Sequence, residues 1–129
     1  MKYLKFDYEG ILADYKSNKT TLKNNKKLIA YYEKGEGVNE SDLNYYEIVS
    51  NPNTLAELHR QADELQLYVD LVDNSLSALQ ENEHLALEFY YIDGKKSEEC
   101  AERMRISVRE FFRIKAVAFD KFCKVIYWQ

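Results

Sequence analysis

The chain has 129 residues, enough for one ordinary domain, and its 46% hydrophobic content exceeds what a disordered chain carries. With only four glycines and one proline there are few helix breaks, which favours an all-α fold. No window approaches the roughly 20 consecutive apolar residues that span a bilayer, so we expect a cytoplasmic protein with no membrane partner.

The charge is segregated along the chain. The net charge is −4, but residues 1–94 carry nine Lys or Arg against 17 Asp or Glu, whereas residues 95–129 carry nine against five. A basic end on an acidic chain favours a nucleic-acid partner for that end and a different role for the rest.

The first segment repeats apolar residues in steps of three and four, which predicts one long helix over residues 3–34 with a heptad seam. Asn18 and Asn25 fill the two polar gaps of the seam. Its apolar members are Leu4, Tyr8, Ile11, Tyr15, Leu22, Ile29 and Tyr32. Residues 35–53, rich in Gly, Asn, Ser and acidic residues, are interpreted as a connector, compatible with a short helical turn around residues 41–49.

A second long helix is expected to start at Thr54, whose hydroxyl and the Glu57 carboxylate have capping-box spacing. Its apolar series again alternates steps of three and four: Leu55, Leu58, Ala62, Leu65, Val69, Val72, Leu76 and Leu79. The two seams predict either an antiparallel hairpin or a coiled-coil dimer, and both hold if two hairpins associate. Residues 1–78 therefore form the expected hairpin or coiled-coil region.

Residues 79–129 read as three shorter helices. The first spans about 81–92 and ends at Gly94, which supplies a positive φ. The second follows an N-cap at Ser97 and turns Cys100, Ala101 and Met104 inward. A turn at residues 105–107 precedes the last helix, which opens at Val108 behind a capping box of Ser107 and Glu110 and runs to about residue 127.

A short helix, a three-residue turn and a longer basic helix are the plan of a helix-turn-helix. Arg109 and Arg113 are four residues apart and stack on one side of the last helix, so they can reach the same DNA groove. We expect helix 108–122 to read the major groove of double-stranded DNA. The predicted DNA-binding residues are Lys95, Lys96, Ser107, Arg109, Arg113, Lys115 and Lys121.

The stretch LQENEHLALEFYYIDGKKSEECAERMRISVREFFRIKAVAFDKF, residues 79–122, resembles the promoter-reading region four of sigma factors. The matching residues are Leu79, Tyr91, Gly94, Glu98, Glu99, Ala101, Glu102, Arg103, Ile106 and Ser107. In length and layout the chain is also similar to the ArpU and RinA groups of phage late-gene transcriptional regulators. The resemblance implies a sigma-like DNA-binding domain over residues 79–129.

The sequence departs from the sigma pattern at several positions. Gln80 stands where proline is usual, and Arg105 stands where glycine is common, so a residue that resists positive φ must make the turn. Val108 and Glu110 replace polar or basic residues at the start of the reading helix, and Phe111 with Phe112 is bulkier than usual.

The sequence contains no nucleophile motif, phosphate-binding glycine loop or HExxH motif, so we expect no enzyme activity and no cofactor. His59 and His84 have no ligand-spaced partner, and no metal site is predicted. Cys100 and Cys123 lie in apolar helical patterns and read as core residues.

Two functions are compatible with these patterns. The first is a sequence-specific DNA-binding transcription regulator of phage or prophage late genes, expected to be a homodimer and to contact RNA polymerase by analogy with sigma factors. The second is a protein-interaction adaptor or anti-activator whose same C-terminal helices dock on RNA polymerase or on a sigma factor.

Overall fold

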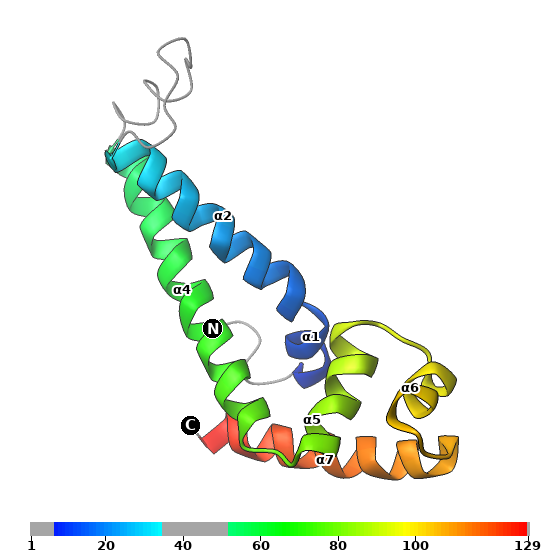
Figure 1. The fold of residues 1–129 in the computed structure, drawn as a ribbon. Coiled ribbons are helices and arrows are strands. Elements are labelled where there is room, and N and C mark those ends of the chain that lie inside the picture. Colours follow the sequence, from blue (N-terminus) through cyan, green and yellow to red (C-terminus); the bar gives the residue numbers. More distant parts are fainter. Residues whose placement is uncertain (1–6, 35–51, 129) are drawn as a thin grey trace. The chain divides into compact units, whose positions relative to one another are not determined.

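The computed structural model describes residues 7–34 and 52–128, and every regular element in these ranges is a helix (Figure 1). The all-α prediction is thus confirmed for the described chain. In order, the elements are α1 (Tyr8–Ala13), α2 (Tyr15–Lys34), α4 (Pro52–Ser77), α5 (Glu81–Leu87), the π-helix η1 (Glu88–Ile92), α6 (Ser97–Met104) and α7 (Val108–Trp128). None of these helices combines the length and the apolarity needed to cross a bilayer.

The single helix expected over residues 3–34 is wrong, because the described part is divided at Asp14. Asp14 has φ −88° and ψ −3°, and its N–H bonds back to α1. Asp7 caps α1, since its Oδ1 accepts from the Gly10 N–H at 2.8 Å. A Cβ at position 10 would collide with the Asp7 carboxylate as it is placed, so a larger residue there would force the Asp7 side chain to shift. The heptad pattern carries no sign of this local cap.

The expected start of the second helix at Thr54 is also wrong, since α4 begins at Pro52. Proline suits the first position of a helix, because its fixed φ is helical and its missing N–H is not needed there. The Glu57 side chain turns forward to Arg60, whose Nε donates to it at 2.9 Å. The predicted turn at residues 41–49 lies outside the described residues, as does the connector up to residue 51.

By spatial contact the chain forms two compact units. One holds residues 17–67, and the other holds the described residues 7–16 and 68–128. The expected hairpin or coiled-coil region of residues 1–78 is therefore divided between the two units.

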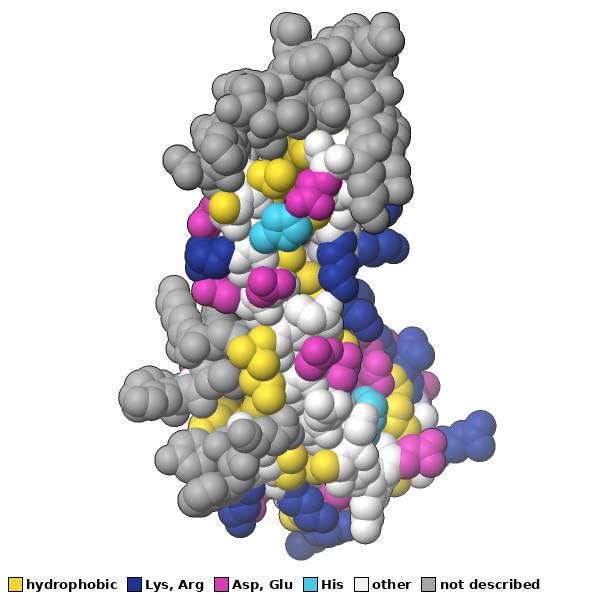
Figure 2. All heavy atoms as spheres, turned by 90° about the vertical axis from the view of Figure 1, so that its left-hand side faces the viewer, with side chains coloured by type: hydrophobic (Ala, Val, Ile, Leu, Met, Phe, Trp, Pro, Cys, Tyr) yellow, Lys and Arg dark blue, Asp and Glu magenta, His cyan; other side chains and the backbone are white. Residues whose placement is uncertain are grey.

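Residues 17–67 contain an antiparallel helix pair (Figure 1). Lys26 Nζ of α2 donates to Gln66 Oε1 of α4 at 2.6 Å. A second pair, Glu33 with His59, lies seven residues later in α2 and seven residues earlier in α4, as expected for antiparallel helices. Figure 2 shows the helix pair in its upper part, where a histidine lies against an acidic side chain with Lys and Arg side chains on both sides. The seam residues Leu22, Asn25, Tyr32 and Ala62 are buried within the single chain, which is the hairpin alternative.

In the other unit, α1 lies against η1. Ile11 and Leu12 are fully buried, and the Tyr68 hydroxyl donates to the Ile11 carbonyl. Tyr15 donates likewise to Asp73, and burial followed by this hydrogen bond raises the pKa of Tyr15. These contacts between distant parts of the sequence connect α1 and the first residue of α2 to the C-terminal half of α4.

The helix expected over residues 81–92 is found with those limits, but its last five residues form the π-helix η1. The Asp93 N–H bonds to the Glu88 carbonyl at 2.8 Å, five residues back, as in a π-turn. Gly94 has φ +70°, which confirms the predicted positive φ. The Lys95 N–H then closes on the Phe89 carbonyl at 2.9 Å and ends the helix.

α6 begins at Ser97 with Lys96 as its N-cap, so the prediction of Ser97 as the cap is wrong by one residue. Extended backbone at Lys96 leads directly into the helix, and no side chain caps it. Cys100 and Ala101 are buried as expected, and Met104 packs partly buried against the same core. α7 begins at Val108, as predicted.

Candidate nucleic-acid interface

The turn between α6 and α7 is built on a left-handed residue. Arg105 has φ 60° and ψ 43°, the conformation that glycine adopts without cost. The Ile106 N–H bonds to the Ala101 carbonyl at 3.0 Å and the Arg105 N–H to the Glu102 carbonyl at 3.1 Å, so two carbonyls of the last turn of α6 are satisfied. The chain therefore makes the turn that the sequence indicated, with an arginine in the strained position.

Ser107 caps α7. Its Oγ accepts from the Glu110 N–H at 3.0 Å, which confirms one half of the predicted capping box. The other half is absent within the described residues, because the Glu110 carboxylate bonds to Arg113 instead. The Ser107 hydroxyl proton remains able to donate to an outside acceptor.

One core supports the start of α7. Ala86, Cys100, Ala101, Phe111 and Ile114 are buried together, and partly buried hydrophobic side chains surround them: Phe89, Tyr90, Met104 and Ile106. α5, α6 and α7 thus pack on one another (Figure 1), and the opposite side of α7 faces outward.

Burial raises the pKa of the Cys100 thiol and, to about 11, that of Cys123. Both cysteines are therefore protonated at neutral pH.

Arg109 lies near the centre of the outward side of α7, roughly opposite the buried Phe111 and Ala118. Among the described residues no carboxylate pairs with it. Arg113, one turn further, is exposed but held by Glu110, with its Nε 3.0 Å from Oε2. This hydrogen bond raises the pKa of Arg113 and lowers that of Glu110. Arg109 is thus the readier of the two to bind an outside acceptor.

The predicted lysines occupy different settings. Lys115 is half-buried, with its Nζ 3.9 Å from the centre of the Tyr90 ring and 5.1 Å from that of Phe112. Lys95 lies 3.8 Å from the Asp93 carboxylate. Lys96 is exposed. The charge of Lys115 is thus fixed in place by aromatic rings, a cation–π arrangement.

Lys121 is part of the fold. Its Nζ donates at 2.7 Å to the carboxylate of Glu83, whose side chain is only 7% exposed. The other oxygen of Glu83 accepts from the Gln80 N–H at 3.1 Å. The hydrogen bond from Lys121 is the main cause that lowers the pKa of Glu83. This contact fastens the start of α5 to α7, so much of the Lys121 charge is already neutralised.

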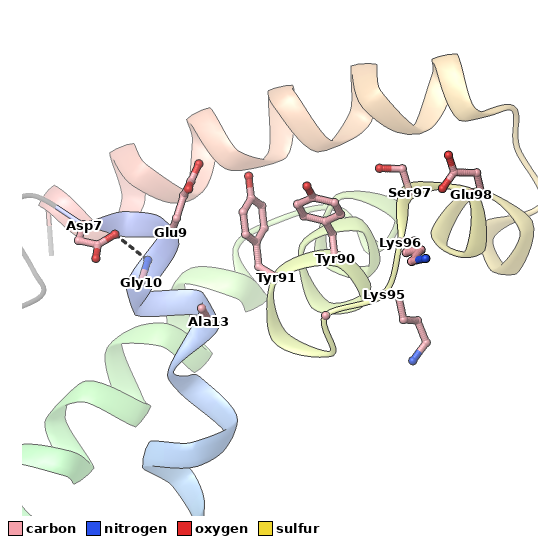
Figure 3. A pocket seen from close by; sticks show the side chains of 11 residues that line it. Asp7, Glu9, Gly10, Ala13, Tyr90, Tyr91, Lys95, Lys96, Ser97 and Glu98 are labelled. Carbon is pink, nitrogen blue, oxygen red and sulfur yellow. Dashed lines mark hydrogen bonds between the residues drawn. The ribbon is translucent and has the colours of Figure 1, made fainter.

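A groove of about 760 Å³ runs beside these elements, between α1 and the start of α6 (Figure 3). Asp7 and Glu9 lie at one end, Lys95 and Lys96 at the other, with tyrosine side chains between them. The sequence could not indicate it, because its walls are more than 70 residues apart in the chain. Its mixed charges suit no single ion, and no three His, Cys, Asp or Glu side chains of the described residues are grouped to hold a metal.

The outward side of α7 also exposes apolar side chains, none of which is among the predicted DNA-binding residues. Val108, Phe112 and Val117 are exposed, although their residue types suggest a core. The signal was present, since the apolar residues of this helix cover more than one face.

No family model, curated protein or solved structure gave a significant match to this chain.

Proposed function

We propose that the protein is a sequence-specific double-stranded DNA-binding transcription regulator. In this proposal α6 and α7 form a helix-turn-helix, and residues 108–122 of α7 enter the major groove. The observation that carries the proposal is the exposed Arg109, which has no carboxylate partner among the described residues and is the second residue of the capped helix α7.

The packing supports this arrangement. α6 and α7 are joined by only three residues and share a core with α5, which would hold the start of α7 outward on a firm base. The resemblance of residues 79–122 to region four of sigma factors supports the same assignment. So does the excess of basic over acidic residues after position 94.

The geometry suggests a division of roles among the candidate residues. Arg109 would bond guanine, and Arg113 would do so after exchanging its contact with Glu110. Lys96, Lys95 and the Ser107 hydroxyl, close to the N-termini of the two helices, would hold phosphates. Lys115 would add positive potential from its fixed position, whereas Lys121, paired with Glu83, would act mainly by holding α7 against α5.

We further propose that the regulator acts as a homodimer in the cytoplasm, by analogy with late-gene regulators of phages, and that it contacts RNA polymerase. A single helix-turn-helix buries little surface, and two copies on half-sites one helical turn apart are the usual remedy. Sedimentation of the full chain with and without DNA tests this. A monomer that stays a monomer on DNA would contradict it.

The second candidate function is an adaptor that docks on RNA polymerase or a sigma factor through the same helix. It is favoured by the exposure of Phe112 (46%) and Val108 (37%), which lie four residues apart on one side of α7 and together form an apolar patch that a protein partner would cover. Salt separates the two functions. Binding through several phosphates weakens steeply as salt rises, whereas an apolar protein contact does not.

The decisive experiment is selection of bound duplexes from a random library with the full chain, followed by affinity measurements on the recovered site. Arg109→Ala should cost about 1–3 kcal/mol on that site and relax one base position. Arg103→Ala is the matched control, because Arg103 is an exposed arginine of α6 paired with Glu99. If no motif is recovered, or if both variants bind alike, α7 does not read DNA.

A further inference from the structure

The outward side of α7 carries two parallel rows. Arg109 and Arg113 are continued by Val117, while Val108, Phe112 and Ala116 form the neighbouring row at the same four-residue spacing. Val108 is 37% exposed and Phe112 46% exposed. An apolar row next to two arginines, on the side of the helix away from the core, needs a partner that offers apolar groups beside acceptors.

The Phe112 ring is held in place. The Lys115 ammonium lies 5.1 Å from its centre, and the ring of the buried Phe111 lies 5.9 Å away in a tilted contact. Lys115 is itself fixed over Tyr90. A side chain that is ordered before binding loses less conformational entropy when a partner covers it.

The charges around the row select the kind of partner. Arg109 and Lys115, three residues before and after Phe112 on α7, place positive charge beside the row, which complements a polyanion, and Arg113 adds to it once it leaves Glu110. In the major groove of DNA the apolar group within reach is the 5-methyl group of thymine, and it lies among the hydrogen-bond acceptors of neighbouring bases. A helix with arginines beside an apolar row therefore matches an edge with guanine next to thymine.

We propose that Phe112, with Val108, recognises thymine methyl groups in the bound DNA site. This inference rests on the proposed function, and it makes Phe112 a residue that determines specificity. Lys115 is a positioning residue that orients the ring. The recognised sequence then contains thymine beside the guanine contacted by Arg109.

The test replaces each thymine of the selected duplex, one at a time, by uracil, which removes only the methyl group. For the wild-type chain, at least one replacement should weaken binding about fourfold, the effect of one buried methyl group. Phe112→Ala should bind the thymine duplex more weakly than the wild-type chain does. This variant should bind the thymine and uracil duplexes with equal affinity. Val117→Ala, another exposed apolar residue of α7, should keep the full difference between the two duplexes.

Because the methyl group is removed from the DNA, the result for the wild-type chain does not depend on how a variant folds. If the selected duplex binds but no uracil replacement changes affinity, the thymine proposal is wrong and DNA binding stands. If Phe112→Ala keeps the thymine preference, another residue makes the contact. If no duplex is bound and Phe112 is needed to bind RNA polymerase, both proposals are wrong and the adaptor function is correct.

Discussion

The hairpin of residues 17–67 and the cluster of α5, α6 and α7 are both helical, but they are specified in different ways. In the hairpin, contacts recur at seven-residue steps, as the pairs Lys26 with Gln66 and Glu33 with His59 show. In the cluster, single residues make each junction, such as Gly94 and Arg105 with positive φ and Ser107 as a cap. Stability is thus spread along the hairpin and concentrated at a few positions in the cluster.

The largest effect should come from the cluster core. Phe111→Ala removes a fully buried ring and should cost about 3–5 kcal/mol. The adjacent Phe112→Ala removes an exposed ring and should change stability by no more than about 0.5 kcal/mol. Amide hydrogen exchange should show lost protection in α5, α6 and α7 for the first variant, with residues 17–34 less affected. Equal effects of the two variants would contradict the assigned packing.

Substitution of the buried polar residue in the seam of the hairpin should raise stability, in contrast to the loss expected for Phe111→Ala. Asn25 is 7% exposed, and its Nδ2 has no acceptor among the described residues. Asn25→Leu should therefore stabilise the hairpin by about 1–2 kcal/mol, measured from the protection of its amides. Asn24→Leu, at the exposed neighbouring position, is the control and should show no such gain. A loss of stability in Asn25→Leu would mean that the amide is satisfied.

Acid should weaken the cluster through Glu83. Its folded pKa lies below the ordinary value of 4.5, so its contacts stabilise the fold above that pH and are lost as the pH falls through the folded pKa. Glu83→Gln should cost about 1 kcal/mol at pH 7 and flatten the decline in stability below pH 4.5. Denaturation across this pH range measures it, with Glu99→Gln in an exposed pair as the control. An unchanged pH profile would contradict the role of the Lys121 contact.

The smallest effect concerns the strained turn. Arg105→Gly removes the strain of the left-handed conformation, and the conformational entropy that glycine adds to the unfolded chain offsets part of this gain. The net effect should be a stabilisation of the cluster by about 0.5 kcal/mol. Arg105→Ala keeps the strain and should bring no gain, and thermal unfolding compares the two. If glycine is no better than alanine, the turn is not strained in solution.

Much of the cluster was predictable because its signals are local. The limits of the 81–92 helix, the positive φ of Gly94 and the start of α7 at Val108 each depend on a few adjacent residues. The break at Asp14 and the π-turn at Glu88–Ile92 were missed. Both occur inside segments whose apolar pattern continues, and periodicity alone does not register them.

The candidate interface divides in the same way. Its arginines and lysines could be named from spacing and charge, but their environments could not. That Lys121 is bound to Glu83, 38 residues away, and that Lys115 lies over the Tyr90 ring follow from packing between separate helices. The predicted set therefore did not distinguish cations that are already engaged from Arg109, which has no carboxylate partner in the described part of the chain.

The sequence by itself determined the helical fold of the described residues, the limits of the 81–92 helix, the start of α7 and the concentration of basic residues near the C-terminus, because periodicity, capping and composition act between neighbours in the chain. Only the tertiary structure decided that the seam residues Leu22, Asn25, Tyr32 and Ala62 are buried within one chain. It also decided that Phe112 is exposed while Phe111 is buried. Adjacent phenylalanines have the same local preferences. Burial instead depends on which side of α7 the core of α5 and α6 covers.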